Sequence, residues 1–183
     1  MKTSYVFLAD GFEEVEAMTS IDVMRRAGMP VVTVSINDGL QVTGAHGVTV
    51  VADSLYADND YSDAEWLVLP GGMPGATNLA AHEQLCRELV AQDERGGKVA
   101  AICASPSVVL APLGILDGCD AVCYPGMEAD VEGITWGDAP VAICGNVVTG
   151  NGPAAAAAFA LSLVGVSMGD DVADSVAAGM LLS

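Results

Sequence analysis

Short runs of apolar residues alternate along the chain with longer segments in which apolar residues recur every three or four positions. A run of four to six β-branched or other apolar residues is typical of a buried strand. Five strands are predicted in this way, at residues 5–9, 31–36, 66–69, 98–103 and 121–124. Because these runs are continuously apolar rather than alternating, they favour a parallel sheet that is covered on both faces.

The segments between the strands have helical periodicity. One helix is predicted over residues 13–27, with Gly28 as its C-terminal stop and four apolar side chains on its inner face: Val15, Met18, Ile21 and Met24. A second is predicted over residues 76–94, again with four side chains inward: Leu79, Cys86, Leu89 and Val90. A third follows Cys103, and a fourth begins near Pro153 and packs the alanine-rich stretch that follows. Strands that alternate with helices of this length indicate βαβ units.

Two further segments add local detail to this pattern. Residues 48–52 favour an antiparallel excursion, and residues 141–149 favour a hairpin around Gly145 and Asn146. No Pro/Gly/Ser-rich linker divides the chain, and no long repeat occurs in it. The sequence therefore predicts one α/β domain over residues 1–183, with a doubly wound and mostly parallel sheet.

The composition of the chain excludes some classes of partner. The chain has 24 acidic and six basic residues, a net charge of −18, and no basic cluster that could meet phosphates, which excludes nucleic acid as a partner. The apolar run near the amino terminus is too short for a secretory core or a membrane span, so no membrane partner is expected. The odd number of cysteines and their irregular spacing predict reduced thiols in the cytoplasm.

No metal or other cofactor is expected. Cys119, Cys123 and Cys144 do not have the spacing of a zinc site, and no histidine is placed to complete four ligands, so these three are interpreted as core cysteines. The chain also lacks a phosphate-binding loop and has no Gly-x-Gly-x-x-Gly after its first strand.

The best candidate for chemistry is Cys103. It ends a predicted strand, and Ser105 and Pro106 after it are typical of an N-cap and a first helical position. A thiol on such a strand-to-helix turn lies beside the positive end of a helix dipole, which favours the reactive thiolate. The alternative is a core cysteine that ends a strand.

Other predicted loops meet Cys103 at the carboxyl edge of the sheet, where sites form in this class of fold. Gly71 and Gly72 either let backbone N–H groups approach a substrate or form a simple tight turn. Tyr124 and Pro125 end another predicted strand. Glu16, one residue after Val15, either turns inward to exchange a proton with the sulfur or is one more solvated charge at a helix start.

The two histidines are weaker candidates. His82 falls among polar residues on a predicted helix and is expected at the surface. His46 lies in a loop flanked by glycines, which could bring it to a site in its own chain or in a partner subunit.

Five motifs together resemble one known family. They are DGFEEVE at residues 10–16, LPGG at 69–72, GAxNL at 75–79, AAICAxP at 100–106 and GNGP at 150–153. In this order, and over nearly the whole chain, they are similar to the ThiJ/PfpI family, and most similar to its parkinsonism-associated deglycase branch.

This resemblance implies a flavodoxin-like, three-layer α/β/α sandwich that forms a homodimer. It makes Cys103 the nucleophile and the oxidation-prone thiol, and Glu16 its carboxyl partner. Gly72 and Ala104 would offer backbone N–H groups to the substrate oxygen. His46 matches a position from which the family reaches across the dimer with a basic side chain.

The chain departs from the family pattern at two positions. Ala104 stands where the protease-like branch has a histidine, which argues against peptidase activity. Tyr124 stands where the deglycase branch has a histidine, and because tyrosine is a poor base near neutral pH, most acid/base work falls to Glu16.

Two classes of function follow. The first is a stress-protective enzyme that uses Cys103 on small reactive carbonyls such as methylglyoxal, in the manner of a glyoxalase or deglycase. The second is a redox sensor or chaperone-like protein without turnover, in which Cys103 is oxidised to a sulfinic acid. A peptidase or a thiamine-biosynthesis role ranks last, because no residue points to a peptide or thiazole site.

Overall fold

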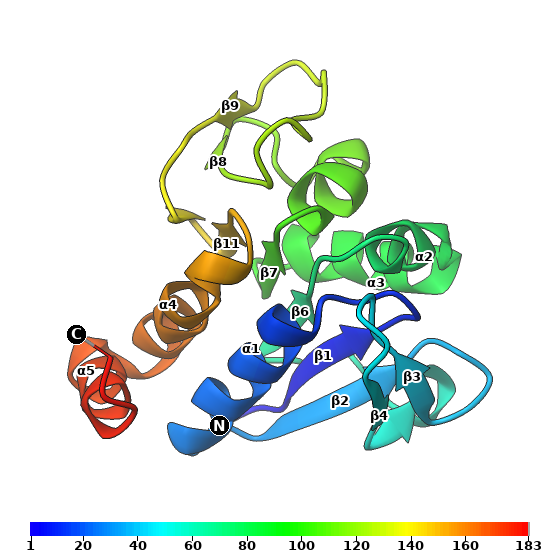
Figure 1. The fold of residues 1–183 in the computed structure, drawn as a ribbon. Helices are drawn as coiled ribbons and strands as arrows, with labels where there is room; N and C mark the ends of the chain where they lie inside the picture. Colours follow the sequence, from blue (N-terminus) through cyan, green and yellow to red (C-terminus); the bar gives the residue numbers. More distant parts are fainter. Residues whose placement is uncertain (183) are drawn as a thin grey trace.

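The computed structural model describes residues 1–182 and is built around a seven-stranded sheet (Figure 1). The strands lie in the order β10-β11-β7-β6-β1-β2-β5. All neighbours are parallel except the hairpin of β10 and β11. The bounds are β1 Ser4–Leu8, β2 Val31–Ser35, β5 Ser54–Leu55, β6 Trp66–Leu69, β7 Lys98–Ile102, β10 Val141–Cys144 and β11 Val147–Gly150. The predicted doubly wound, mostly parallel sheet is confirmed.

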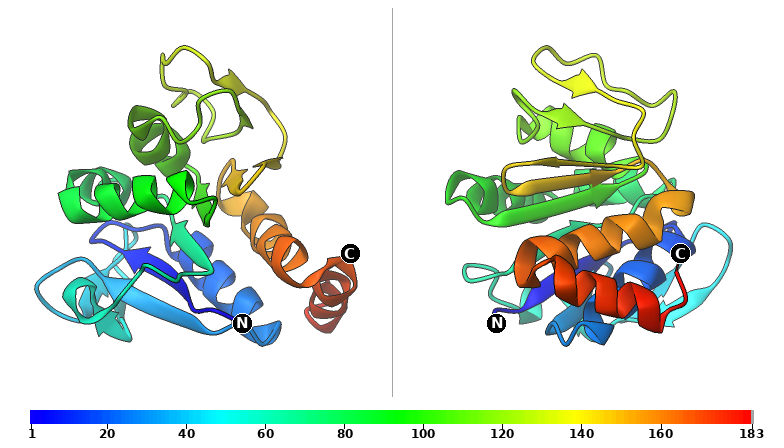
Figure 2. Two further views of the ribbon diagram at one scale, coloured as in Figure 1. Left: turned by 180° about the vertical axis from the view of Figure 1, so that it is seen from behind. Right: turned by 90° about the vertical axis from the view of Figure 1, so that its left-hand side faces the viewer.

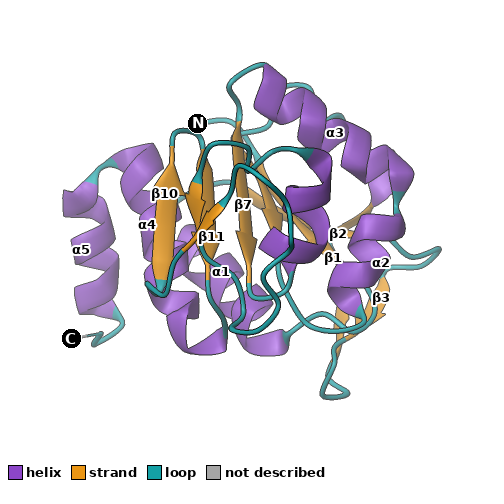
Figure 3. Cartoon of the chain, turned by 90° about the horizontal axis from the view of Figure 1, so that it is seen from above, coloured by secondary structure: helices purple, strands orange, loops and turns teal. Residues whose placement is uncertain are grey.

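Helices cover both faces of this sheet (Figures 2 and 3). On one face, α1 (Glu14–Arg26) packs against α4 (Ala156–Met168), and α5 (Asp170–Gly179) packs on α4. On the other face lie α2 (Gly75–Ala81), α3 (Glu83–Glu94) and the π-helical η2 (Pro106–Leu110) with the 3₁₀ turn η3 (Ala111–Leu113). Two hydrophobic clusters, one on each side of the sheet, form the core of a three-layer sandwich. Among residues 1–182, no helix is long and apolar enough to cross a bilayer.

Two local predictions are confirmed and one is wrong. β3 (Gln41–Thr43) and β4 (Thr49–Val51) form the antiparallel excursion, and β10 and β11 form the expected hairpin. The strand predicted at 121–124 is reduced to β8 (Asp120–Ala121), which pairs with β9 (Thr135–Trp136) outside the main sheet. The backbone N–H groups that follow β8 bond elsewhere, that of Val122 to Thr149 Oγ1 and that of Tyr124 to the Cys103 carbonyl. This segment therefore links β8 to the sheet instead of extending a strand.

The buried face of α1 differs from the predicted one. Val15 is 52% exposed and Met18 is 37% exposed, whereas Glu16 and Ser20 are buried with Ile21. The helix is thus turned so that a carboxylate, rather than an apolar side chain, faces the ends of the strands. The prediction was wrong for Val15 and Met18, because apolar spacing alone does not show which face of the helix packs against the sheet.

The single helix predicted over residues 76–94 is interrupted at His82. Its backbone is not helical, and its Nδ1 accepts the backbone N–H of Leu85 at 3.1 Å, so the imidazole caps α3. The ring also packs against Tyr56, with 4.4 Å between the ring centroids. His82 is therefore half-buried and structural, contrary to the surface position predicted for it.

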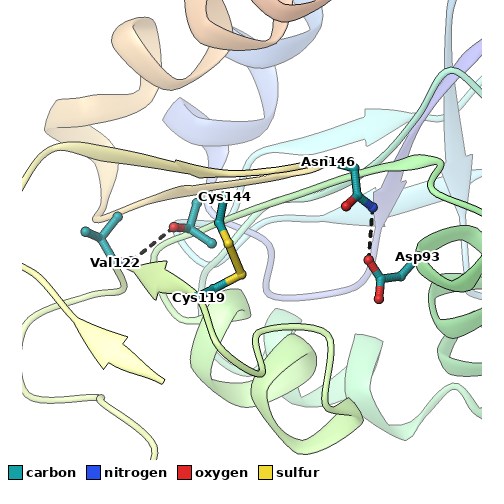
Figure 4. The surroundings of a disulfide bond; sticks show 6 residues. Asp93, Cys119, Val122, Cys144 and Asn146 are labelled. Carbon is teal, nitrogen blue, oxygen red and sulfur yellow. Dashed lines mark hydrogen bonds between the residues drawn. A yellow bond between two sulfur atoms is a disulfide. The ribbon is translucent and has the colours of Figure 1, made fainter. Parts of the chain in front are cut away.

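A disulfide joins Cys119 to Cys144 (Figure 4), which contradicts the prediction that all five cysteines are reduced. The β10–β11 hairpin carries Cys144 alongside the segment that leads into β8, with 5.7 Å between the two Cα atoms. The other three cysteines, Cys86, Cys103 and Cys123, are free thiols. Sequence spacing did not reveal the pair because its partners meet through tertiary packing.

Replacing both bridged residues with alanine, Cys119→Ala with Cys144→Ala, is expected to lower the free energy of unfolding by about 3 kcal/mol, since the bond closes a loop across 25 positions and constrains the unfolded chain. Denaturant unfolding without reductant measures this loss. Cys86→Ala, which removes a half-buried free thiol, is the control and is expected to cost less. Equal stability of the double variant and the wild type would contradict the expectation.

Candidate active site

Cys103 sits on a sharp turn between β7 and the helical segment that follows. Its φ of 65° lies in the left-handed region, which non-glycine residues rarely adopt. Its backbone is held on both sides, because its N–H donates to the Gly150 carbonyl at 2.9 Å and its own carbonyl accepts from Tyr124 at 2.8 Å. The elbow predicted from the sequence is therefore present, and neighbouring segments fix its conformation.

Ser105 occupies the N-cap position and Pro106 the start of the helix, as predicted, but the Ser105 side chain makes no capping hydrogen bond. Its backbone is already helical, and the first turn of the helix includes a bond from the N–H of Val108 to the carbonyl of Ala104. The Ser105 hydroxyl instead donates to the buried carbonyl of Pro70 at 2.5 Å. The elbow is thereby bonded to the loop that follows β6.

Glu16 lies fully buried beside this elbow. Its Oε2 accepts the backbone N–H of Gly71 at 2.8 Å, and its carboxyl lies beside Cys103, because a Cβ on Gly71 would touch both side chains. Its Oε1 has no hydrogen-bond partner among residues 1–182. The carboxylate of Glu13 accepts the backbone N–H of Glu16 at 2.8 Å and caps α1, which fixes Glu16 in the first turn. Of the two interpretations of Glu16, the inward one is confirmed.

The two glycines after Pro70 are required by space as well as by conformation. A Cβ on Gly71 would stand 2.5 Å from the Cys103 Cβ and 2.7 Å from Glu16 Oε2. Gly72 has a φ of +90°, and a Cβ there would stand 2.5 Å from the Gly11 carbonyl oxygen. The backbone N–H groups of Gly72 and Ala104 act to lower the pKa of the Cys103 thiol. The loop is therefore more than a tight turn, because its backbone contacts both reactive side chains.

Burial dominates the electrostatics of this pair. It raises the pKa of the Glu16 carboxyl to about 7, against a smaller lowering by the Gly71 N–H. Burial, followed by the negative charge of Glu16, raises the pKa of the Cys103 thiol to about 12, although the N–H groups of Gly72 and Ala104 oppose this. The expected low pKa of the thiol is therefore wrong. Burial of the sulfur raises the pKa of the thiol by more than the neighbouring helix start lowers it.

Gly71→Ala is expected to cost about 1–3 kcal/mol of stability and to displace Glu16 from Cys103, because the added methyl group overlaps both side chains. Thermal unfolding and the rate of Cys103 alkylation measure the two effects. Gly39→Ala is the matched control, since a Cβ at Gly39 meets nothing within 4 Å. A fully stable Gly71→Ala protein with unchanged alkylation would show that the loop has more room than the structure gives it.

Glu16 is also expected to make stability depend on pH. Its pKa is raised on folding from 4.5 to about 7, so the folded state keeps a proton that the unfolded state loses. The wild type should therefore lose about 3 kcal/mol relative to Glu16→Gln as the pH rises from 4 to 8. Urea unfolding of both proteins at each pH measures this difference, in which the other carboxylates cancel.

Glu14→Gln is the control with the opposite sign. Burial acts to raise the pKa of Glu14, but hydrogen bonds from His46 and Val48 outweigh it and lower the pKa. Glu14→Gln should therefore lose stability relative to the wild type as the pH rises through the range in which Glu14 ionises while His46 still carries its proton. A difference between the wild type and Glu16→Gln that stays constant from pH 4 to 8 would contradict the raised pKa of Glu16.

A pocket opens next to the elbow. Its volume is about 320 Å³, and it is lined by Tyr124, Pro125, Asn151, Gly152, Pro153 and Ala154. The side chain of Tyr124 is 47% exposed, and its ring lies 3.4 Å from the point where a Cβ of Gly152 would stand. The GNGP motif thus forms one wall of a pocket whose other wall is Tyr124. Asn151 was not singled out from the sequence.

The structure places His46 on Glu14, with 2.8 Å between Nδ1 and Oε2. The imidazole is exposed, and its hydrogen bond with Glu14 raises the pKa of His46. Glu13, Glu14 and His46 offer ligand atoms within 4.8 Å of one another. Each of the three is already engaged by the helix cap or by this ion pair, and we assign no metal to the cluster.

Comparisons with known proteins relate the chain to one family. Residues 2–165 match the model of the DJ-1/PfpI family. Protein dj-1beta of Drosophila melanogaster is 35% identical over 100% of this chain and 98% of its own length. A deglycase of Pyrococcus abyssi is 31% identical over 81% of this chain and 89% of its own. DJ-1 homolog B of Arabidopsis thaliana is 37% identical over 86% of this chain, but only 36% of the plant protein is matched. For DJ-1 homolog A of the same plant the matched share is 47%, so this chain spans about a third to a half of these two relatives.

Solved structures show the same fold. A DJ-1 superfamily protein from Salmonella typhimurium superposes with a TM-score of 0.93 at 32% identity, and the match covers both chains completely. A structure described as oxidized DJ-1 of Toxoplasma gondii has a TM-score of 0.91 at 35% identity, again over the whole of both chains.

Proposed function

The chain belongs to the DJ-1/PfpI family, and from this premise we propose that it is a cysteine-dependent enzyme that converts small reactive carbonyls into hydroxy acids. The observation that carries the proposal is the buried contact between Glu16 and Cys103. A buried acid with a pKa of about 7 beside a thiol suits proton transfer near neutral pH. The related Pyrococcus abyssi protein, described as a deglycase, supports a carbonyl substrate.

In this proposal the pair shares one proton near neutral pH. When the carboxyl holds that proton, the charge that disfavours the thiolate is gone, and the N–H groups of Gly72 and Ala104 stabilise the sulfur anion. The reacting form is then a thiolate on Cys103 beside a neutral Glu16. The two side chains act as a nucleophile and its acid/base partner.

The first step joins sulfur to substrate. The thiolate attacks the aldehyde carbon of methylglyoxal, the electron pair of the C=O bond moves to oxygen, and the proton on Glu16 passes to that oxygen to give a hemithioacetal. The N–H groups of Gly72 and Ala104, which act to lower the pKa of the thiol, are placed to stabilise the transient oxyanion.

The second step is an internal redox exchange that needs no external oxidant. The Glu16 carboxylate removes the hydrogen of the former aldehyde carbon as a proton, and the hydroxyl proton on that carbon passes to the neighbouring ketone oxygen, which gives an enediol. Glu16 then returns its proton to the former ketone carbon. The first carbon is oxidised to a thioester while the second is reduced to an alcohol. Water then cleaves the thioester, which releases lactate and regenerates the Cys103 thiol.

The pocket beside the elbow is proposed to hold the part of the substrate that does not react. Tyr124 and Pro125 border it, and Tyr124 is bonded to Cys103 through its backbone. The phenol of Tyr124 can donate or accept a hydrogen bond but cannot replace an imidazole as a base near neutral pH. Glu16 therefore carries the proton transfers in this proposal.

Lactate formation tests the proposal. The purified chain is incubated with methylglyoxal, and lactate is measured enzymatically against a buffer blank and a heat-denatured sample. Formation of lactate over many turnovers per chain is expected. Consumption of methylglyoxal without lactate, or a single equivalent of adduct per chain, would contradict turnover.

A redox sensor is the second candidate, and the same contact favours it. Two equivalents of hydrogen peroxide would take Cys103 to a sulfinic acid, and the carboxyl of Glu16 is placed to hydrogen-bond to the new oxygen. Mass spectrometry after mild peroxide is expected to find Cys103 oxidised ahead of the free, half-buried Cys86. Equal oxidation of the two thiols would remove this candidate.

A homodimer is part of the proposal. Exposed apolar side chains on α1 and on the β3–β4 hairpin, Val15, Met18 and Val51, would supply its contact. The hairpin lies against the start of α1 through the bond from the Ala45 N–H to the Phe12 carbonyl. Light scattering during size-exclusion chromatography tests it, and a monomer at micromolar concentration would contradict it.

A further inference from the structure

We propose that Ser105 is a positioning residue of the Cys103–Glu16 centre, whose hydroxyl fixes the peptide unit that holds the Glu16 carboxyl. The inference rests on the proposed function only in taking Cys103 as the reactive group. It concerns how the centre is built, and it holds for turnover and for oxidation alike.

The peptide unit between Pro70 and Gly71 is held at both of its polar ends. Its carbonyl accepts the Ser105 hydroxyl at 2.5 Å, and its N–H donates to Glu16 Oε2 at 2.8 Å. Hydrogen bonds that run through one amide polarise one another, so the first strengthens the second. The chain of bonds therefore leads from the elbow, two residues after Cys103, back to the carboxyl beside the sulfur.

Nothing in this arrangement is solvated. Ser105 and Glu16 have no exposed surface, and Pro70 is buried. Without the hydroxyl, the Pro70 carbonyl would lose its hydrogen bond in a region without water contact, which favours a shift of the loop toward another donor. A Cβ on Gly71 would overlap both Cys103 and Glu16, so the loop lies tightly against the pair and cannot shift without changing these contacts.

The negative charge of the Glu16–Cys103 pair can lie on either side chain, and the backbone N–H groups of the loop stabilise it on both. The Gly71 N–H stabilises the charge on Glu16, and the next N–H, that of Gly72, stabilises the charge on the Cys103 sulfur. A displaced loop therefore weakens the singly charged pair in either form. The one further charged group that faces the pair within residues 1–182 is Glu13, whose backbone N–H donates to the Gly71 carbonyl at 2.9 Å and which is therefore bonded to the same loop. Loss of the Ser105 hydroxyl should then raise the pH at which the pair releases its first proton.

The test is the rate of Cys103 alkylation by iodoacetamide as a function of pH, followed by mass spectrometry of the intact chain. For Ser105→Ala the midpoint of the profile is expected to rise by about half a unit to one unit, because a hydrogen bond to a charged group is weakened rather than removed. Below the midpoint this makes alkylation about three- to tenfold slower. Ser105→Thr, which keeps the hydroxyl, should restore the wild-type midpoint.

Ser107→Ala is the matched control. Ser107 is also buried and belongs to the same helical segment, but its hydroxyl donates to the Met127 carbonyl, away from the glycine loop. Its removal should leave the alkylation midpoint unchanged, at a similar cost in thermal stability. A shift of equal size in both variants, or no shift in Ser105→Ala, would overturn the proposal.

These outcomes are separate from those of the proposed function. If the wild type forms no lactate and Ser105→Ala still shifts the midpoint, the carbonyl activity fails and the positioning role stands. If lactate forms and the midpoint does not move, the positioning role fails alone. If Ser105→Ala does not fold, the alkylation midpoint of Ser105→Thr is compared with that of the wild type. Because Ser105→Thr retains the hydroxyl, a changed midpoint in this variant contradicts the proposal.

Discussion

Cys103→Ala is expected to reduce lactate formation from methylglyoxal by a factor on the order of 10³ or more, to the rate of the blank. Without the sulfur there is no covalent intermediate, and no other thiol can take its place, because the elbow presents this residue alone to Glu16 and to the N–H groups of Gly72 and Ala104. The variant should fold, since alanine has no side-chain atom beyond Cβ to accommodate. Initial rates with matched protein concentrations and circular dichroism spectra provide the measurement.

Two other free cysteines serve as controls for this loss. Cys86→Ala and Cys123→Ala remove thiols whose pKa values are raised, chiefly by burial, and which lie outside the contact with Glu16. Both variants should keep at least half of the wild-type rate. Activity that survives in Cys103→Ala, or that depends on Cys123, would show that the reacting thiol is not at the elbow.

Glu16→Gln should lower kcat for lactate formation by about 10²–10⁴-fold, the usual range for losing a general acid/base group. Glutamine can still accept the Gly71 N–H through its amide oxygen, so the loop should stay in place while the exchangeable proton is lost. KM should change much less than kcat, because the pocket between Tyr124 and Pro153 is untouched. Steady-state rates over a range of methylglyoxal concentrations separate the two constants.

The neighbouring carboxylate is the control for Glu16. Glu14 lies at the start of the same helix but bonds to His46 instead of the glycine loop. Glu14→Gln should therefore leave kcat within a few-fold of the wild type. A Glu16→Gln protein with nearly wild-type kcat would contradict an acid/base role for Glu16.

The sequence was sufficient for the architecture because the central strands are continuously apolar and the helices between them end at glycines. It failed where a polar side chain was placed by tertiary contacts. The inner face of α1 includes Glu16 instead of Val15, and Ser105 bonds to a distant carbonyl instead of capping its own helix. The Cys119–Cys144 disulfide likewise depends on a hairpin that brings distant residues together.

The residues that form the site could be predicted from the sequence, but the direction of the pKa shift of the thiol could not. The motifs placed Cys103, Glu16 and the two glycines at one edge of the sheet, and the structure brings them into contact. The local signal at the helix start favoured a low pKa for the thiol. Burial of both side chains reverses that direction, and burial depends on how the layers pack, which spacing along the chain does not encode.

The pH dependence of Cys103 alkylation in the wild type and in Glu16→Gln distinguishes a proton shared between Cys103 and Glu16 from an ordinary buried thiol, without any assumption about substrate. We expect a wild-type rate that rises with a midpoint near pH 7 and then levels off, and a clearly different midpoint in Glu16→Gln. A rate that climbs without a plateau through pH 9, as an ordinary buried thiol would show, and that is the same in both proteins would contradict this expectation.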